Sequence, residues 1–428
     1  MDNITVTALG EKLRSRTISP VTLIEQLINR AEKMNSSHNV FITLCRSKAL
    51  EQARKIEDEI NRGIVRGFLQ GIPIGVKDNI HFKDVRITYG SKLFADKISE
   101  TTATVLAKLE QAGAVVVGKT NLTEFSLANK DDDPYYGQVK LMNGNPLHDS
   151  NNGSAAAVSL GLSSIAVGTD SDGFLPTTAT MAGVVSLRPS FGRVSRHGVL
   201  PVSYSLDAVC FFGKSVEDLA AVLKATAGFD LMDESSVYAE VPRYMSQIFR
   251  KPEGLKIGII APQEKYVGVE RLMNLCDRCE FSAVEARFSI NGLADLWTRI
   301  GLAEAAAFHD DFFQEWRDKY GPNARQLLLA GRTTSAVDYL KALKKRNEIN
   351  IRVEKLFEQF HLLATVFQVG GDEESVDTSF GMPAALLGYP AVTMPLTHDR
   401  GIGLTLVGKP FEESLLLRAA RQLECSRT

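Results

Sequence analysis

The stretch GTDSDGFLPTTA, residues 168–179, has the composition of a catalytic loop. Its glycines allow a tight turn, and hydroxyl and carboxyl side chains stand beside them. Where a small nucleophilic side chain would suit the bend, the sequence has Phe174. A phenyl ring cannot attack a carbonyl group. The loop therefore raises the question of what, if anything, acts in place of a nucleophile.

A second residue that could take part in catalysis is Lys77, in GIPIGVKDNI. A lysine next to an aspartate is typical of a solvated surface. The apolar residues that precede Lys77 favour a buried position instead, and burial would lower the pKa of its ammonium group, as a catalytic base requires.

Alternating strands and helices are expected to position these residues. Ser19 and Pro20 are typical of the start of a helix, which continues through an apolar stripe. GIPIGVKDNI predicts a strand, TATVLAKLEQAGA a helix and VVVGKTN a buried strand. GSAAAVSLGL predicts a closely packed helix, and SIAVG a strand that leads into the 168–179 loop. This order predicts an α/β fold.

In the second half of the chain, a segment with a helical pattern is followed by strand-like segments. Residues from about 235 to 345 are rich in charge and in helical periodicity, whereas HLLATVFQVGG, YPAVTMPL and IGLTLVGK are strand-like. Basic residues at 341–346 alternate with apolar ones, which predicts an amphipathic helix with a solvated basic face. We expect a single domain over residues 1–428, with a helical excursion at about 235–345.

Composition excludes several classes of function. The 428 residues are 44% hydrophobic and 23% charged, which is enough apolar material for a large core. The net charge of -2 argues against nucleic-acid binding through bulk charge. We find no apolar stretch long enough to span a membrane and no signal peptide at the start. The five scattered cysteines fit a cytoplasmic protein, which is the location we expect.

Neither a metal nor a cofactor is expected. The seven histidines show no ligand spacing, and no phosphate-binding loop occurs. Cys276 and Cys279 continue a helical apolar pattern, which favours a structural position for the pair.

A series of motifs resembles the amidase signature enzymes, which hydrolyse or transfer carboxamides. They stand in the family's order over nearly the whole chain: GIPIGVKDNI, AGAVVVGKTNLTEFSL, GSAAAVSLGLSSIAVGTDSDG, AGVVSLRPSFGRVSRHGVLPVSYSLDAV, GMPAALLGYPAVTMPL and GLTLVGKPFEESLLLRAARQLE. The resemblance implies one large domain in which helices wrap a mixed β-sheet.

The resemblance also implies a mechanism and assigns its residues. In the family a neutral lysine takes a proton through a serine in a cis peptide, a second serine attacks the carbonyl, and a glycine-rich turn holds the oxyanion. The lysine corresponds to Lys77 and the bridging serine to Ser150. The nucleophile corresponds to Phe174. The remnant of the oxyanion turn corresponds to Ser171, Asp172 and Gly173.

Several neighbours depart from the family pattern as well. Asp149, Asn151 and Asn152 surround Ser150, where the family has glycines and serines, which disfavours the cis peptide. Asp172 replaces a glycine, and a carboxylate about 4 Å from an oxyanion would cost roughly 4 kcal/mol at an effective dielectric constant of about 20. Pro176 takes the place of an arginine that would pair with an acid such as Asp170.

Two hypotheses follow. In the first, the chain is a non-catalytic binding, regulatory or scaffold protein, with another subunit or an active amidase as partner and a carboxamide as possible ligand. In the second, it is an amide hydrolase or amidotransferase-type enzyme with a relocated nucleophile, for which the candidates are Ser171, Thr177, Thr178, Cys210 and a Schiff-base-forming Lys77. A hydroxyl or thiol within hydrogen-bond reach of Ser150 or Lys77, beside an open cavity, would favour the second.

The first hypothesis carries two structural expectations. Phe174 should be largely buried against the remains of the catalytic cleft, and Lys77 should form a salt bridge with Asp172.

Overall fold

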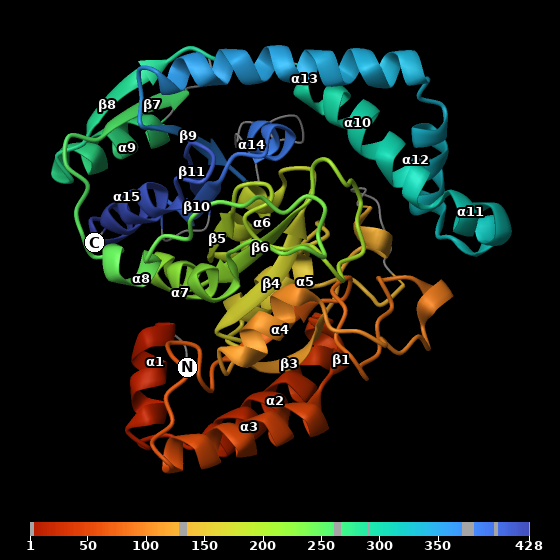
Figure 1. Cartoon of the computed structure of the whole chain (residues 1–428), viewed down its shortest axis with the longest axis vertical. Coiled ribbons are helices and arrows are strands. Elements are labelled where there is room, and N and C mark those ends of the chain that lie inside the picture. The colour runs from red at the N-terminus through yellow and green to blue at the C-terminus, as the bar shows by residue number, and fades with distance from the viewer. Residues whose placement is uncertain are drawn as a thin grey trace.

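The structure, a computed structural model, describes residues 4–127, 135–260, 267–289, 292–369, 381–397 and 401–427. Within these ranges a mixed sheet of 11 strands crosses the molecule in the order β1-β3-β2-β4-β6-β5-β10-β11-β9-β7-β8 (Figure 1). The strands are β1 Phe41–Leu44, β2 Pro73–Lys77, β3 Val115–Thr120, β4 Ile165–Asp170, β5 Val185–Arg188, β6 Ala208–Gly213, β7 Lys256–Ile260, β8 Ser282–Ala286, β9 Leu362–Gln368, β10 Ala391–Pro395 and β11 Ile402–Val407.

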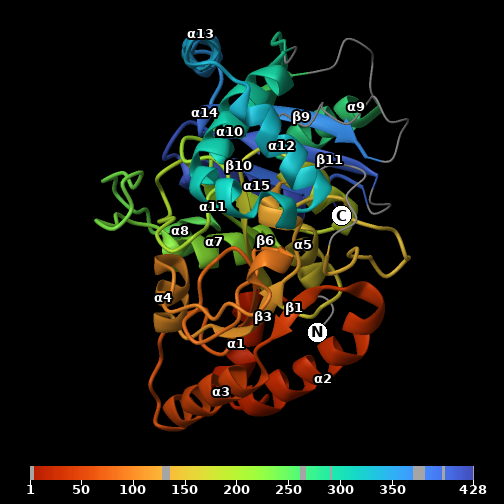
Figure 2. The ribbon, with the colours of Figure 1, turned by 90° about the vertical axis from the view of Figure 1, so that its right-hand side faces the viewer.

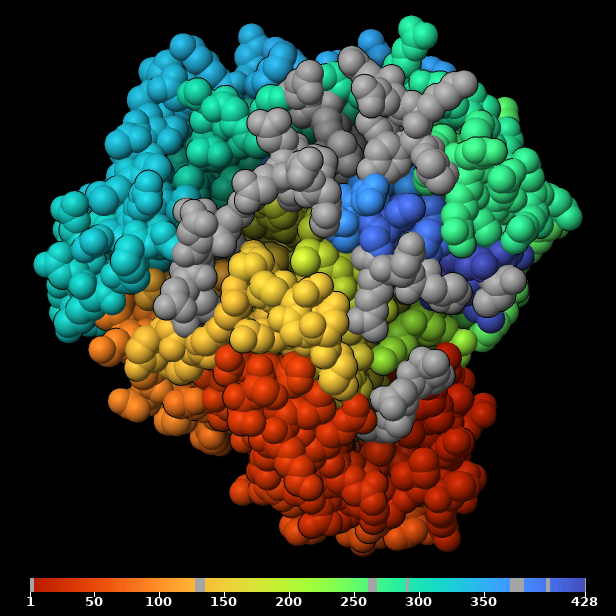
Figure 3. All heavy atoms as spheres, turned by 180° about the vertical axis from the view of Figure 1, so that it is seen from behind, coloured from red at the N-terminus to blue at the C-terminus, as the bar shows by residue number. Residues whose placement is uncertain are grey.

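Helices surround this sheet, as the resemblance implied. They are α1 Val6–Arg14, α2 Pro20–His38, α3 Arg46–Asn61, α4 Thr104–Gln111, α5 Asn152–Ser159, α6 Leu175–Ala182, α7 Val216–Thr226, α8 Tyr244–Gln247, α9 Val267–Arg278, α10 Leu293–Phe308, α11 Asp310–Trp316, α12 Pro322–Arg332, α13 Ala336–Phe357, α14 Gly381–Leu387 and α15 Glu413–Cys425. Helices α2 and α3 lie at one end of the molecule and α13 at the other (Figures 1 and 2). Seen from behind, the N-terminal residues again form one end (Figure 3).

The first half of the fold forms as the local patterns predict. Ser19 precedes α2 and its hydroxyl accepts the N–H of Thr22, with Pro20 at the first helical position. Strands β2, β3 and β4 coincide with the predicted apolar runs, and every residue in them is buried. Strand β2 runs parallel to both β3 and β4, so β2 and β4 end at the same edge of the sheet. Lys77 and the 168–179 loop meet at that edge, where ligands of such sheets commonly bind.

Small residues allow α5 to lie very close to this edge. A Cβ atom added at Gly153 would stand 2.4 Å from the backbone nitrogen of Asn121 and 2.5 Å from its oxygen. A larger residue there would displace the start of α5, and with it the neighbouring Ser150.

The segment at 235–345 is not purely helical, which corrects our expectation. Strands β7 and β8 lie within it and extend the main sheet beyond β9 in parallel register. The short run KIGII was not predicted as a strand because charged residues with helical periodicity surround it in the sequence. Helices α10 and α12 follow these strands, and α13 continues past the expected boundary to Phe357.

Helix α13 carries the basic run, and the apolar residues on it are not all buried. Leu340 is 63% exposed and Ile351 is 46% exposed, whereas Ala342, Ile349 and Val353 are buried. The alternation of basic and apolar residues correctly indicated a helix, but not the face that packs inward.

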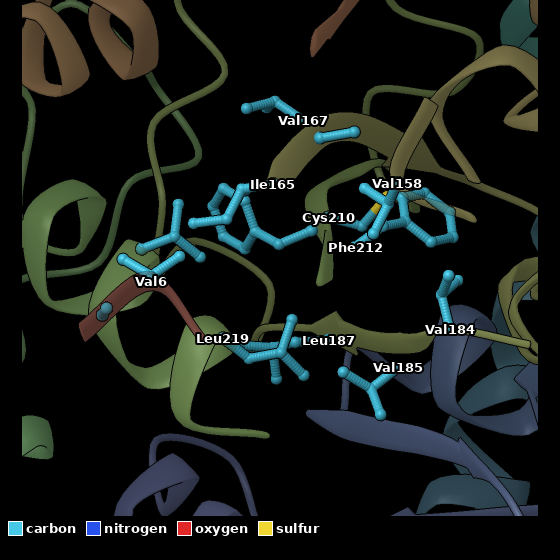
Figure 4. Packing of buried hydrophobic residues seen from close by; sticks show 14 of the residues in the cluster. Val6, Val158, Ile165, Val167, Val184, Val185, Leu187, Cys210, Phe212 and Leu219 are labelled. Carbon is cyan, nitrogen blue, oxygen red and sulfur yellow. The ribbon is translucent and has the colours of Figure 1, made fainter. Parts of the chain in front are cut away.

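The core lies on both faces of the central strands. Cys210 on β6 packs among apolar residues that include Val158, Val167 and Phe212 (Figure 4). Cys276 lies on α9 and Cys279 directly follows it; both are buried and unpaired. Among the helices of the described residues, none has the length and hydropathy to cross a membrane.

Candidate functional site

Lys77 ends strand β2 with its side chain completely buried. Its Nζ atom lies 3.1 Å from Ser150 Oγ and 3.0 Å from Thr169 Oγ1. Burial lowers the pKa of the Lys77 ammonium group below its ordinary value, although nearby acidic groups, Asp149 first among them, oppose the shift. A lysine in these surroundings is suited to hold its amine neutral and to accept a proton from a hydroxyl group.

The expected salt bridge between Lys77 and Asp172 is wrong. Over the described residues, no carboxylate lies within ion-pair distance of Lys77. The amine instead contacts two hydroxyl groups, and one carboxylate oxygen of Asp172 accepts the N–H of Phe174 at 3.2 Å.

Ser150 reaches Lys77 from the loop that precedes α5. The described part of the chain contains no cis peptide bond, so the bond between Asp149 and Ser150 is trans. The Ser150 N–H donates to its neighbour Asp149 at 2.5 Å. The contact between the serine hydroxyl and the lysine thus forms with a trans bond.

Asn151, one of the departures from the family pattern, binds this loop to strand β4. Its side-chain amide donates to the carbonyl oxygen of Thr169 at 2.8 Å, and its Oδ1 accepts the Thr169 N–H at 3.2 Å. The close approach requires Gly168, because a Cβ there would stand 2.5 Å from Asn151 Oδ1. Asn151 therefore fixes the distance between Ser150 and β4.

Asp170 keeps a cationic partner in spite of Pro176. Arg188 on β5 lies 2.7 Å from the Asp170 carboxylate, and both side chains are 1% exposed. The same carboxylate accepts the N–H of Gly173 at 3.1 Å. The replacement of the family's arginine by Pro176 therefore leaves no uncompensated charge at Asp170.

Phe174 is 37% exposed, so the ring is only partly buried, less than expected. It is the last residue before α6 and follows Gly173, whose φ is +80°. A Cβ on Gly173 would stand 2.3 Å from the backbone nitrogen of Met382. Helix α14 therefore packs tightly against the turn at Gly173.

The rest of the turn is held by polar contacts. Trp297 on α10 donates its indole N–H to the Ser171 carbonyl oxygen at 2.8 Å. Burial raises the pKa of the Asp172 carboxyl group, and the carboxylates of Asp149 and Asp170 raise it further. A protonated Asp172 would not repel a developing oxyanion. The expected destabilisation of an oxyanion by a charged Asp172 is therefore smaller.

Of the candidate replacement nucleophiles, Thr178 is engaged in a hydrogen bond and Cys210 is inaccessible. Thr178 donates its hydroxyl to the Asp149 carboxylate, and Ser171 is buried in the turn. Cys210 is fully buried, and burial raises the pKa of its thiol well above the ordinary value. Thr177 lies partly exposed on α6. In the described chain, none of these four hydrogen-bonds Lys77.

Besides Ser150, the hydroxyl that hydrogen-bonds Lys77 is that of Thr169, which sequence reasoning did not select. Its Oγ1 atom also lies 3.1 Å from Asn79 Nδ2. The signal that could have found it is its place next to the end of β4, the parallel neighbour of the strand that ends in Lys77.

A surface cavity of ≈ 600 Å³ lies beside Thr169. Besides Thr169, its lining includes Arg196, His197, Tyr204 and Asp207. Neither Lys77 nor Ser150 is among the described residues that line it. Thr169 therefore both lines the cavity and contacts the buried lysine.

Within the described ranges, no group of three or more histidine, cysteine, aspartate or glutamate residues could hold a metal ion.

Comparison with known proteins identifies the family of the chain. Residues 22–417 match the family model described as Amidase. Two similar proteins are the A subunits of the glutamyl-tRNA(Gln) amidotransferases of Halalkalibacterium halodurans and Trichormus variabilis. The first is 30% identical over 96% of this chain and 95% of its own, and the second 32% identical over 98% and 96%. The structure of peptide amidase from Stenotrophomonas maltophilia aligns with a TM-score of 0.84 at 26% identity, over 98% of this chain and 96% of its own. We conclude that the chain belongs to the amidase family.

Proposed function

We propose that this protein acts on carboxamide C–N bonds, as a hydrolase or as part of an amidotransferase, with Lys77 as the proton acceptor. The observation that carries the proposal is a fully buried lysine whose amine contacts two hydroxyl groups and, over the described residues, no carboxylate. The names of the two amidotransferase relatives favour amide transfer over simple hydrolysis.

A second buried lysine shows by contrast why Lys77 is unusual. Lys119 on β3 is equally inaccessible, but its Nζ lies 3.1 Å from a carboxylate oxygen of Asp78 and 2.5 Å from the Ile80 carbonyl oxygen. This is the ordinary way to satisfy a buried ammonium group, because an unpaired one costs several kcal/mol. Among the described residues, Lys77 has no such carboxylate partner. This arrangement would destabilise a charged ammonium group and favours the neutral amine that a base requires.

Two features of the sequence that argued against catalysis are less unfavourable in the structure. Asp170 is balanced by Arg188, and the raised pKa of Asp172 favours its neutral form. The departures around the site are therefore compatible with chemistry on an amide carbonyl.

A second candidate is a non-catalytic member of the family. It is favoured by Phe174, which stands at the nucleophile position that the resemblance assigns. In addition, the N–H groups of Gly173 and Phe174, which would otherwise be oxyanion donors, donate to the carboxylates of Asp170 and Asp172. Under this proposal the chain would serve as a binding or scaffold protein beside an active amidase.

Two further aspects of the proposal concern location and organisation. The buried cysteines Cys45, Cys210, Cys276 and Cys279 are free thiols, which supports a reducing compartment and hence the cytoplasm. The sheet extends through β1 and β8 as one unit, which supports one domain that includes the segment at 235–345.

Release of ammonia from simple carboxamides such as glutamine tests the main proposal. We expect turnover by the natural protein and a loss of at least about a hundredfold in Lys77→Met, since general acid–base catalysis contributes about that much or more. Lys341→Met, which removes an exposed lysine on α13, is the matched control and should retain activity. If the folded natural protein is inactive alone and with co-purified partners, the non-catalytic candidate is favoured instead.

A further inference from the structure

We propose that Thr169 is the nucleophile of this chain. The inference rests on the proposed function and adds to it the residue that forms the covalent intermediate. Three observations support it: contact with Lys77, contact with the cavity, and a second hydrogen-bond donor at the same oxygen atom.

The first observation is the contact with the base. Thr169 Oγ1 lies 3.0 Å from Lys77 Nζ, within the range expected for a nucleophile and its base. Because β2 and β4 are parallel neighbours in register from Ile74 to Val76, the two side chains are held by the sheet rather than by a loop.

The second observation is access. Ser150 lies at a similar distance from Lys77, 3.1 Å, but is not among the described residues that line the ≈ 600 Å³ cavity, whereas Thr169 is. Thr169 is only 5% exposed, so a carbonyl group that reaches its hydroxyl would be largely screened from water. Of the two hydroxyls on Lys77, Thr169 is therefore the one that a substrate in the cavity can meet.

The third observation is the donor Asn79. Its Nδ2 lies 3.1 Å from Thr169 Oγ1 and 3.3 Å from the Leu200 carbonyl oxygen, so its orientation is fixed. When neutral Lys77 accepts the threonine proton, the Asn79 amide continues to donate to Oγ1 and stabilises the negative charge that develops there. Ser150 Oγ would then accept an N–H from the lysine and so position the amine.

The proposed reaction has two stages. The proton of Thr169 passes to Lys77 Nζ, Oγ1 bonds to the amide carbon, and the C–N bond breaks as the leaving nitrogen takes the proton from Lys77. Water then attacks the resulting ester, loses a proton through the same lysine, and releases the carboxylic acid while Oγ1 regains its hydrogen. The net reaction consumes one amide and one water molecule and yields one acid and one amine or ammonia.

Labelling with a fluorophosphonate, followed by mapping of the adduct by mass spectrometry, tests the assignment directly. We expect the adduct on Thr169. Thr169→Val, which keeps the side-chain shape, should lose the label and at least about a thousandfold in ammonia release, by comparison with removal of nucleophiles elsewhere. Thr169→Ser should retain label at position 169 and measurable turnover, which a purely structural role would not predict. Circular dichroism and thermal melting establish that each variant is folded.

Other outcomes would overturn the assignment and show which proposal fails. An adduct on Ser150, or full ammonia release by folded Thr169→Val with loss in Lys77→Met, would refute Thr169 and leave the proposed function intact. An absence of both label and ammonia release in the natural protein would refute both.

Discussion

Replacement of Phe174 by serine would restore the nucleophile at the position the family uses, and we expect it to fail as a repair. The turn's N–H groups at residues 173 and 174 donate to Asp170 and Asp172, so they are not free to bind an oxyanion. The amine of Lys77 also already contacts the hydroxyl of Thr169, which competes for the same base. Phe174→Ser should therefore not create a new catalytic hydroxyl.

The cost in stability follows from the exposure of the ring. Full burial of a phenylalanine side chain contributes about 1.5–3 kcal/mol. At 37% exposure about two thirds of the area is buried, so loss of the ring should cost about 1–2 kcal/mol, less than the 3–5 kcal/mol of a fully buried phenylalanine. Phe174 precedes α6 with φ -77° and ψ -7°, which is not the extended geometry of a capping serine. Serine and alanine at this position should therefore destabilise the fold equally.

The assay combines urea unfolding, ammonia release and fluorophosphonate labelling of the natural protein, Phe174→Ser and Phe174→Ala. Equal destabilisation of the two variants and no adduct at position 174 would support the reasoning. An adduct on the new serine, together with faster ammonia release than in Phe174→Ala, would refute it, because the turn would then still be organised for catalysis.

Three further predictions concern the groups around the site. Arg188→Met should lower the free energy of unfolding by about 3–5 kcal/mol, because Asp170 would stay buried without its cation, and addition of Asp170→Asn should recover part of the loss in urea unfolding; full stability of the single variant would contradict this. The raised pKa of Asp172 means that the folded state binds its proton more tightly than the unfolded state does. Relative to Asp172→Asn, the natural protein should therefore lose stability as the pH rises from the unfolded value, about 3.9, through the folded pKa; parallel pH profiles in thermal melting would contradict it. Trp297→Phe should cost about 0.5–1.5 kcal/mol through loss of the hydrogen bond to the Ser171 carbonyl, whereas Trp316→Phe on α11, which does not contact this turn by a described hydrogen bond, serves as the control in the same unfolding assay.

Local patterns in the sequence predicted much of the fold. The apolar runs at β2, β3 and β4 and the cap of α2 formed where expected, because hydrophobic periodicity and helix-start residues act over a few neighbouring positions. The same patterns did not identify β7 and β8, whose short runs lie among charged residues. They also did not determine which face of α13 is buried, since that depends on the helices packed against it.

By itself, the sequence determined that Lys77 and Ser150 are present, that Phe174 stands where the family has its nucleophile, and that the chain has the family's order of motifs. Only the tertiary structure decided which polar groups meet. Lys77 lies 73 positions from Ser150 and 92 from Thr169. The cation that pairs with Asp170 is Arg188, whereas the family pattern places an arginine at position 176. Residue type reveals what a side chain can donate or accept, but the partner of a buried polar group is set by which distant strands become neighbours in the sheet.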